Sequence, residues 1–234
     1  MSAPTHPVAA VPDRLFADDA REERWRARFT ATRMSRPTWA RDAPDRNVYT
    51  SNATGTIEVY AWDRATDTHR QVTDRRAGTH LATLPPDGKS IWWFADTDGD
   101  EFGRWVAEPF AGGEPAPALA GVEDGYPAGL SVGRTTVAVG TSTDAATRIW
   151  VRRADQPAAV VYETDEDAGV GGLSEDETLL AISHSEHGDA RHPDVRVLRV
   201  ADGSTVAEKS DGPGKGLTPL AFAPVPGDPR LLLL

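Results

Sequence analysis

Residues 84–94 read LPPDGKSIWWF, in which an apolar residue ends a short run, a polar turn follows and a strand-like run restarts. Related stretches occupy residues 39–51, 130–140, 173–183 and 222–234, so the pattern returns at steps of 45, 46, 43 and 49 residues. Only β-type runs lie between these turns. A period in the forties with such runs is typical of a β-propeller built from four-stranded blades. The sequence therefore predicts an all-β fold.

The repeats divide residues 37–234 into units at about 37–80, 81–125, 126–168, 169–216 and 217–234. The last unit contains too few strand-like runs for four strands, so we expect about four and a half blades. An incomplete ring leaves strand edges open, and repeat arrays need terminal caps. We therefore expect this sequence to be a piece of a longer protein.

Residues 1–36 are predicted to form an arm and an amphipathic α-helix that precede the propeller. The arm, residues 1–12, is rich in Ala, Pro and Val. In residues 13–34, Asp18 and Asp19 favour a helix N-terminus, and Trp25 and Phe29 share one face because they are four residues apart. We expect about four turns that dock on another surface, with Glu22 and Glu23 on a solvated face and the binding of a substrate amine by these two acids as the alternative.

The composition excludes several classes of function. The net charge of −11, without any basic run, argues against a nucleic acid or an anionic membrane as partner. The chain has no cysteine, so disulfides, thiolate nucleophiles and Cys-ligated zinc are excluded. No signal-peptide pattern or membrane-spanning apolar run is visible. We expect a cytoplasmic protein.

Residues 129–133, GLSVG, match the GxSxG pattern of a nucleophile elbow. Such an elbow needs a strand, a strained turn at the serine and then a helix. After Gly133 the sequence is β-branched and strand-like, and the motif is in register with the other repeat turns. We interpret Ser131 as part of a blade turn, with a nucleophile as the alternative.

Two loops carry groups that can bind a cation. Asp96, Asp98 and Asp100 alternate in DTDGDE, as carboxylates do in calcium loops, although the EF-hand pattern then fails. We interpret the segment as an Asp/Gly-rich turn whose side chains bond their own backbone, with a bound cation as the alternative. The histidines of the second loop stand among carboxylates in HSEHGDARHPD, without a known zinc spacing. They are His184, His187 and His192, and we interpret the segment as a polar loop that faces a neighbouring domain, with a metal site as the alternative.

Two further features are interpreted as structural. Residues 212–216, GPGKG, lack the serine or threonine and the strand-to-helix context of a phosphate-binding loop, so an inter-blade linker is expected. Four tryptophans lie within strand runs, where packing between blades explains them better than ligand stacking. They are Trp92, Trp93, Trp105 and Trp150.

The blade sequences at residues 56–74 (TIEVYAWDRATDTHRQVTD) and 90–105 (SIWWFADTDGDEFGRW) resemble the propeller of bacterial prolyl oligopeptidase-family serine peptidases. The acylaminoacyl-peptidase and dipeptidyl-aminopeptidase-like branch is the most similar, and residues 20–29 (AREERWRARF) stand where these proteins have a helical extension. TolB-type propellers share the general turn pattern.

The resemblance implies a propeller that caps an α/β-hydrolase domain and gates short or N-terminally blocked peptides. In that family the catalytic triad lies in the hydrolase domain, which is absent from this sequence. We therefore assign no catalytic, cofactor-binding or metal-binding residue to this chain and expect it to be inactive alone. The alternative is a stand-alone TolB/WD40-like propeller that binds a protein or peptide as a scaffold.

Overall fold

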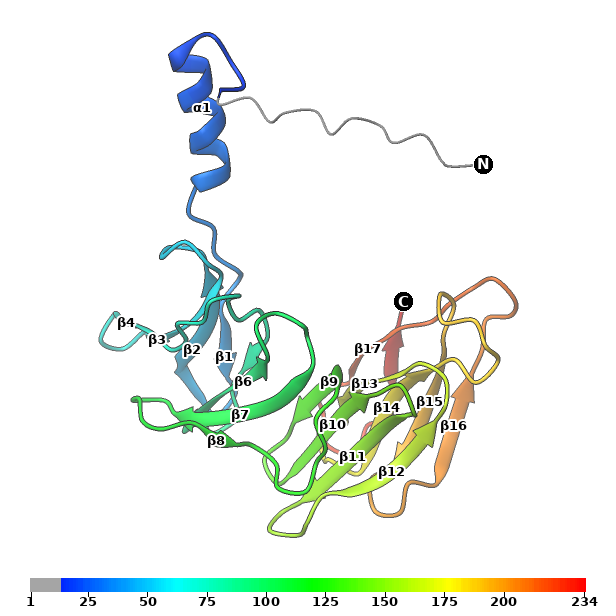
Figure 1. The fold of residues 1–234 in the computed structure, drawn as a ribbon. Helices are drawn as coiled ribbons and strands as arrows, with labels where there is room; N and C mark the ends of the chain where they lie inside the picture. The colour runs from blue at the N-terminus through cyan, green and yellow to red at the C-terminus, as the bar shows by residue number, and fades with distance from the viewer. Residues whose placement is uncertain (1–13) are drawn as a thin grey trace, which may run out of the picture. The chain divides into compact units, whose positions relative to one another are not determined.

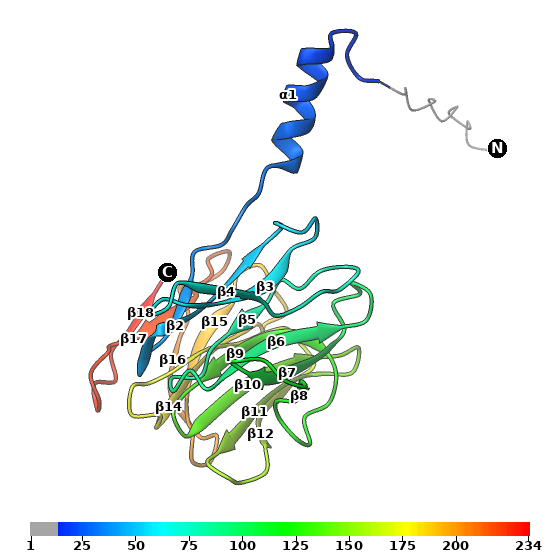
Figure 2. The ribbon, with the colours of Figure 1, turned by 90° about the vertical axis from the view of Figure 1, so that its left-hand side faces the viewer.

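The computed structural model describes residues 14–234, which divide into two compact units. The first unit ends at Arg33 and the second covers Met34–Leu234. Each unit is described by itself, and the predicted arm at residues 1–12 lies outside the described residues. Figures 1 and 2 show a helix in the first unit and strands in the second.

The first unit contains α1 (Asp19–Thr30), twelve residues long. It begins where Asp18 accepts hydrogen bonds from the backbone N–H groups of Ala20 and Arg21, at 2.9 and 3.2 Å. The predicted pair of Trp25 and Phe29 is formed, with ring centroids 4.9 Å apart. The expected four turns are too many, because this cap excludes residues 14–18 and the helical backbone ends before Ala31.

Glu22 departs from the predicted solvated face, because only 7% of its surface is exposed. Its carboxylate accepts hydrogen bonds from the backbone N–H groups of Leu15 and Phe16, at 3.2 and 3.0 Å, and from Arg26 at 3.0 Å. The carboxylate thus fastens the segment before the helix against the first turns. Sequence alone treats this acid as one more charged helix residue and misses the capping role.

The second unit consists of four four-stranded antiparallel sheets and one two-stranded sheet, each with its strands in chain order. Blade one contains β1 (Thr38–Ala40), β2 (Ala43–Ser51), β3 (Glu58–Asp63) and β4 (Thr68–Gln71). Blade two contains β5 (Ala82–Thr83), β6 (Ser90–Asp96), β7 (Gly103–Pro109) and β8 (Ala116–Pro117). Blade three contains β9 (Tyr126–Val132), β10 (Thr136–Ser142), β11 (Thr147–Arg153) and β12 (Ala159–Thr164). Blade four contains β13 (Ala168–Leu173), β14 (Leu179–His184), β15 (Asp194–Arg199) and β16 (Thr205–Lys209).

The remaining half-blade pairs β17 (Pro219–Phe222) with β18 (Leu231–Leu233). The backbone of Thr218 extends this pairing, because it exchanges hydrogen bonds with the backbone of Leu234 in both directions. The sheets confirm the predicted fold class, an all-β partial propeller of about four and a half blades preceded by an α-helix. Met34 and Ser35 already pair with Ser51 and Thr50 of blade one, three residues before the expected start of the repeats.

Three apolar clusters join the blades in sequence. The first connects blades one and two through residues that include Val59 and Trp93, and the second connects blades two and three through Trp92 and Val137. The third connects blades three and four through Ile149 and Leu180. The sheets of blades two and three are covered on both faces by their neighbours, which explains why their second strands are nearly continuous apolar runs. The outermost strand β16 is exposed throughout.

Candidate functional site

Strand order places the loops of all blades on two faces of the propeller unit. Because consecutive strands are antiparallel, the loop from the second to the third strand lies on the same side as the connection to the next blade. We call this side the connector face and the opposite side the turn face. The second-to-third-strand loops on the connector face are residues 52–57, 97–102, 143–146 and 185–193, and the connections are residues 72–81, 118–125, 165–167 and 210–218.

Two hollows lie side by side on the connector face and share Pro127. The hollow between blades two and three has a volume of about 290 Å³, and Phe94, Asp96 and Glu101 contribute to its lining. The hollow between blades three and four has a volume of about 440 Å³. The rings of Phe102 and Tyr126, both exposed, meet edge to face with centroids 5.3 Å apart. Together these features form the candidate functional site.

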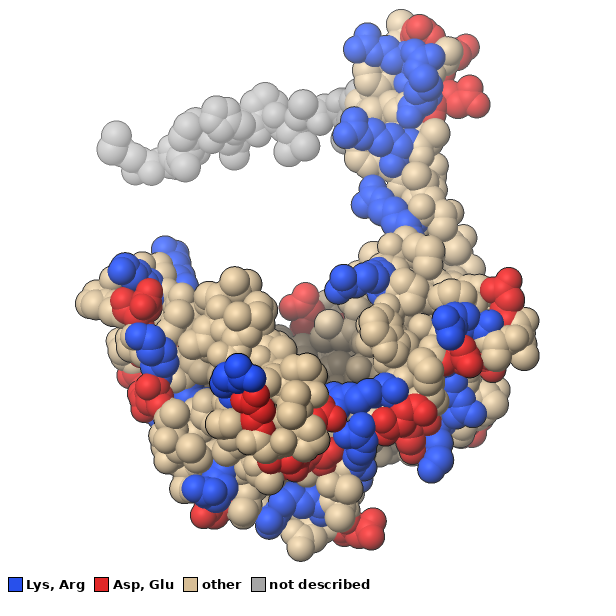
Figure 3. All heavy atoms as spheres, turned by 180° about the vertical axis from the view of Figure 1, so that it is seen from behind, with Lys and Arg blue, Asp and Glu red and all other residues tan. Residues whose placement is uncertain are grey.

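Charges of both signs are mixed on one face of this unit. In Figure 3, Lys and Arg side chains lie beside Asp and Glu over the visible face of the propeller unit. Several of the pairs join adjacent segments of the connector face, such as Arg75 with Asp96 at 2.9 Å and Arg104 with Asp124 at 2.6 Å. Part of the charge on this face is therefore used in local ion pairs.

The loop that begins at Asp96 is a self-capped turn. The carboxylate of Asp100 accepts hydrogen bonds from the backbone N–H groups of Thr97 and Phe102, both at 3.0 Å. Asp96 accepts from the backbone of Glu101 at 3.3 Å and pairs with Arg75. These contacts engage the carboxylates of Asp96 and Asp100 with the surrounding backbone and Arg75, as in an Asx turn, and Asp98 has a positive φ of 52° within the same turn.

The histidines of the second candidate loop are separated by the structure. His184 ends β14 and is 2% exposed, whereas His187 and His192 lie in the loop and are more accessible. His187 faces Asp194 at 3.5 Å, and His192 contacts Asp189 at 2.8 Å. Within residues 14–234, no group of three or more His, Cys, Asp or Glu side chains is arranged to hold a metal ion. The loop and the strand that follows it thus contain two separate His–Asp pairs.

The outer strands of blades three and four meet in a charged cluster around Arg196. Its guanidinium contacts Glu186 at 2.8 and 2.9 Å and Glu208 at 3.2 Å. Tyr162 donates a hydrogen bond to Glu186 at 2.7 Å. Hydrogen bonds from Arg196 and Tyr162 lower the pKa of Glu186 to about 2, and burial lowers the pKa of the adjacent His184. The cluster thus stays ionised at neutral pH, with a neutral imidazole behind it.

Ser131 has a structural environment. It lies inside β9 and is followed by β10, so the helix of a nucleophile elbow is absent at this position. Its hydroxyl accepts a hydrogen bond from the backbone N–H of Leu173, at 3.1 Å, which ties the first strands of blades three and four together. Gly129 has a φ of +93°, and a Cβ there would stand 2.6 Å from the carbonyl oxygen of Val170. Strand packing therefore accounts for this glycine and the serine of the GLSVG match.

Residues 212–216 and the four tryptophans also take the positions expected of them. The GPGKG segment lies in the connection between β16 and β17, where the backbone N–H of Lys215 donates to the carbonyl of Gly212. Trp92 and Trp93 are buried in different inter-blade clusters. Trp105 packs edge to face on Phe94, and Trp150 donates to Thr141 at 2.9 Å.

A network of ion pairs on the turn face links blades that are distant in the sequence. Arg134 of blade three contacts Asp42 of blade one at 2.9 and 3.0 Å and Glu175 of blade four at 3.2 Å. Arg41 of blade one also pairs with Glu175. The hydrogen bonds and charge of Arg134 lower the pKa of Asp42. The first turns of three blades are therefore connected directly, although exposed ion pairs of this kind contribute little stability individually.

Glu177 joins the first turns of blades three and four through several hydrogen bonds. Its carboxylate accepts hydrogen bonds from the backbone N–H groups of Arg134, Thr135 and Thr136 and from the hydroxyl of Thr135. Burial acts to raise the pKa of Glu177, but these hydrogen bonds hold it below the usual value of 4.5. A carboxyl with a lowered pKa stabilises the fold above its unfolded pKa, and that stabilisation is lost as the pH falls through the folded pKa.

We expect the Glu177→Gln variant to lose about 1–2 kcal/mol of unfolding free energy at pH 7, because an amide replaces a charged acceptor. The difference from the unchanged protein should shrink below pH 4.5, as Glu177 itself becomes protonated. Urea unfolding at several pH values measures this effect. Glu114→Gln, at an exposed position, is the control. Two results would contradict this role of Glu177: equal losses of unfolding free energy in the two variants, or a difference between Glu177→Gln and the unchanged protein that persists below pH 4.5.

The hydroxyl groups of the hollow between blades three and four were not identified from sequence. Ser142, Thr147, Ser183 and Ser185 come from strand ends and loops up to 43 positions apart and belong to no common motif. A weak signal exists, because the second strands of both blades end in small hydroxyl residues, TST at 141–143 and SHS at 183–185. Only the alignment of the two blades brings these ends together.

Comparisons with known proteins support the fold. No protein-family model matches the sequence, and no curated protein sequence matches it. A prolyl endopeptidase, from a study of inter-domain dynamics in catalysis and specificity, is 16% identical with a TM-score of 0.58, over 80% of this chain and 29% of the other. A putative TolB from Agrobacterium tumefaciens is 16% identical with a TM-score of 0.58, over 83% of this chain and 68% of the other. An oligogalacturonate lyase in complex with manganese is 15% identical with a TM-score of 0.59, over 80% of this chain and 56% of the other.

These likenesses place the second unit among the β-propellers. The chain spans less than a third of the length of the prolyl endopeptidase. At 15–16% identity the likeness concerns the fold alone, and it extends equally to a peptidase, a TolB protein and a lyase. Among the described residues, no helix has the length and apolar character needed to cross a membrane.

Proposed function

We propose that this chain supplies the non-catalytic propeller cap of a prolyl oligopeptidase-type serine peptidase. The parent enzyme would cleave short or N-terminally blocked peptides in the cytoplasm through an acyl-enzyme, without a metal or an organic cofactor. The sequence resemblance in blades one and two and the fold likeness to a prolyl endopeptidase support this proposal. The hydrolase domain would lie outside this sequence.

The observation that carries the proposal is the position of the two hollows. The first strand of every blade starts at the connector face, and the fourth strand of blades one to four ends there. A domain joined to a complete blade in the same chain would therefore attach at this face. Both hollows and the Phe102–Tyr126 pair lie on it. Such a face would form the propeller wall of a closed peptide chamber, and Ser131 would hold strands together without taking part in catalysis.

A second candidate function is a TolB-like propeller that binds a protein or a peptide and has no catalytic partner domain. The match to the TolB protein favours it, because 83% of this chain is aligned over 68% of that protein. In that case the same hollows would bind the partner directly. The two candidates differ in whether a serine hydrolase accompanies the propeller.

Labelling with a fluorophosphonate, which reacts with the nucleophile of serine hydrolases, separates the two candidates. We expect the polypeptide that antibodies against residues 34–234 recover from its native cells to be labelled. The purified 234-residue chain and its Ser131→Ala variant should both remain unlabelled. Absence of label on the native polypeptide would contradict the peptidase proposal and favour the binding propeller. Label on the purified chain that disappears in Ser131→Ala would show that Ser131 is a nucleophile after all.

A further inference from the structure

The hollow between blades three and four combines hydroxyl groups with one carboxylate. Its lining contains no Lys, Arg or His side chain. The polar side chains that line it are Ser142, Thr147, Asp167, Ser183, Ser185 and Tyr126. A site of this composition offers hydrogen-bond acceptors and negative charge, and lacks any built-in counter-ion. It therefore suits a ligand that is a cation and a hydrogen-bond donor.

Ser185 gives the strongest indication of a missing partner. Its surface is 1% exposed, and its backbone N–H donates to the carbonyl of Asp167 at 2.9 Å. Its hydroxyl makes no hydrogen bond to any residue in the described part of the chain, although it lines the hollow. The hydroxyl is open to the hollow, so a bound ligand can supply a hydrogen bond that the described residues do not. Nearby, Ser142 and Thr147 already share a hydrogen bond at 3.0 Å.

Asp167 supplies the charge at the rim of the hollow. It follows Asp165 and Glu166 in the connection between the two blades. None of these three carboxylates forms a salt bridge with another residue in the described range 14–234. On the same face, Asp96 and Asp124 are paired with arginines. The unpaired charge makes the hollow locally electronegative.

The remaining lining is apolar and small. Ala128, Ala168 and Ala190 contribute methyl groups, and Pro127 and Pro193 contribute rings. These side chains leave a volume of about 440 Å³, which exceeds what a single ammonium group needs. An alkyl chain attached to the ammonium group can therefore lie against this wall and bury apolar surface.

We propose that this hollow binds a primary ammonium group attached to a short apolar chain. The ammonium carries three N–H donors. One is directed to the carboxylate of Asp167 and the others to serine hydroxyls, with Ser185 among the acceptors. A quaternary ammonium has the charge without the donors, and an alcohol has a donor without the charge. The site should therefore prefer a primary amine to both. This binding does not depend on the proposed peptidase function.

The test is a titration of the 234-residue chain with n-butylammonium, n-butanol and tetramethylammonium, followed by two-dimensional amide NMR. We expect saturable shifts at residues of this hollow with n-butylammonium, and at least about tenfold weaker binding of the other two compounds. Asp167→Asn should weaken n-butylammonium binding about tenfold or more, and Ser185→Ala about threefold to tenfold.

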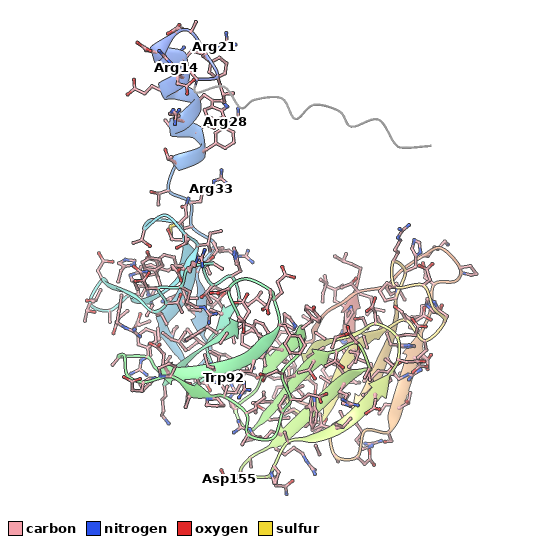
Figure 4. The ribbon with its side chains drawn as sticks, viewed as in Figure 1. Arg14, Arg21, Arg28, Arg33, Trp92 and Asp155 are labelled. Atoms are coloured by element: carbon pink, nitrogen blue, oxygen red, sulfur yellow. The ribbon has the colours of Figure 1, made fainter. Side chains whose placement is uncertain are left out.

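Asp155→Asn is the matched control, because Asp155 lies in the exposed turn between β11 and β12, on the turn face (Figure 4). This variant should bind like the unchanged chain, and the thermal unfolding midpoint of each variant shows whether it is folded. Three results would overturn the proposal: n-butanol or tetramethylammonium binding as tightly as n-butylammonium, unchanged affinity in a folded Asp167→Asn variant, or no saturable shift with n-butylammonium in the unchanged chain.

Discussion

Leu180→Ala is expected to lower the free energy of unfolding by about 3–5 kcal/mol, because it removes a branched side chain from a closed core. Leu180 lies in β14 and is 0% exposed. Its cluster includes Ile149 of blade three and Leu198 of blade four, so the cavity would open where the two blades meet. The rigid sheets on both sides limit collapse around the missing atoms. Urea unfolding followed by circular dichroism measures the change.

The control for this change is Val206→Ala. Val206 lies in the outermost strand of blade four and is 47% exposed, so the substitution should cost no more than about 0.5 kcal/mol. If Leu180→Ala and Val206→Ala reduced stability equally, the cluster between blades three and four would not be a core of the folded protein. The packing of these blades would then need revision.

Gly140→Ala is expected to destabilise the protein by about 3 kcal/mol through overpacking against backbone. Gly140 lies in β10 opposite an irregularity in the pairing with β9. A Cβ at this position would stand 2.1 Å from the carbonyl oxygen of Ala128. Backbone cannot rotate away as a side chain can, so the first strand of blade three would have to move. Urea unfolding again measures the loss.

Gly169→Ala is the matched control at the same junction of blades. A Cβ there would meet the Ser183 hydroxyl at 3.3 Å and the carbonyl of Ala128 at 3.5 Å, which are tight or ordinary contacts. We expect a loss of less than about 1 kcal/mol, because only a side chain has to adjust. A Gly140→Ala variant as stable as Gly169→Ala would contradict the close packing of β9 on β10.

The blades were predictable because their turns are encoded locally. In the stretch that begins at Leu84, Asp87 accepts a hydrogen bond from the backbone of Lys89 at 3.0 Å, and Gly88 has a φ of +62°. In the equivalent turn of blade four, Asp176 accepts from the backbone of Thr178 at 3.1 Å. Such contacts involve residues two positions apart, so each copy of the turn leaves a signature in its own sequence. Repetition of that signature predicts the architecture.

Contacts between blades, including those that form the candidate site, were not predictable in the same way. The ion pair between Arg134 and Asp42 joins residues 92 positions apart, and the hollow with Ser142 and Ser185 draws on two blades. No short motif marks such contacts, because they depend on how one blade is placed against the next. Motifs that do stand out, GLSVG and DTDGDE, have structural explanations in strand packing and turn capping.

The apparent mass of the fluorophosphonate-labelled polypeptide in its native cells tests the central proposal most directly. The chain described here has a mass of 25.2 kDa. If it is the cap of a serine peptidase, the antibody against residues 34–234 and the fluorophosphonate should mark the same band, far heavier than this mass. A single unlabelled band at this mass would contradict the peptidase proposal and leave a propeller that acts by binding alone.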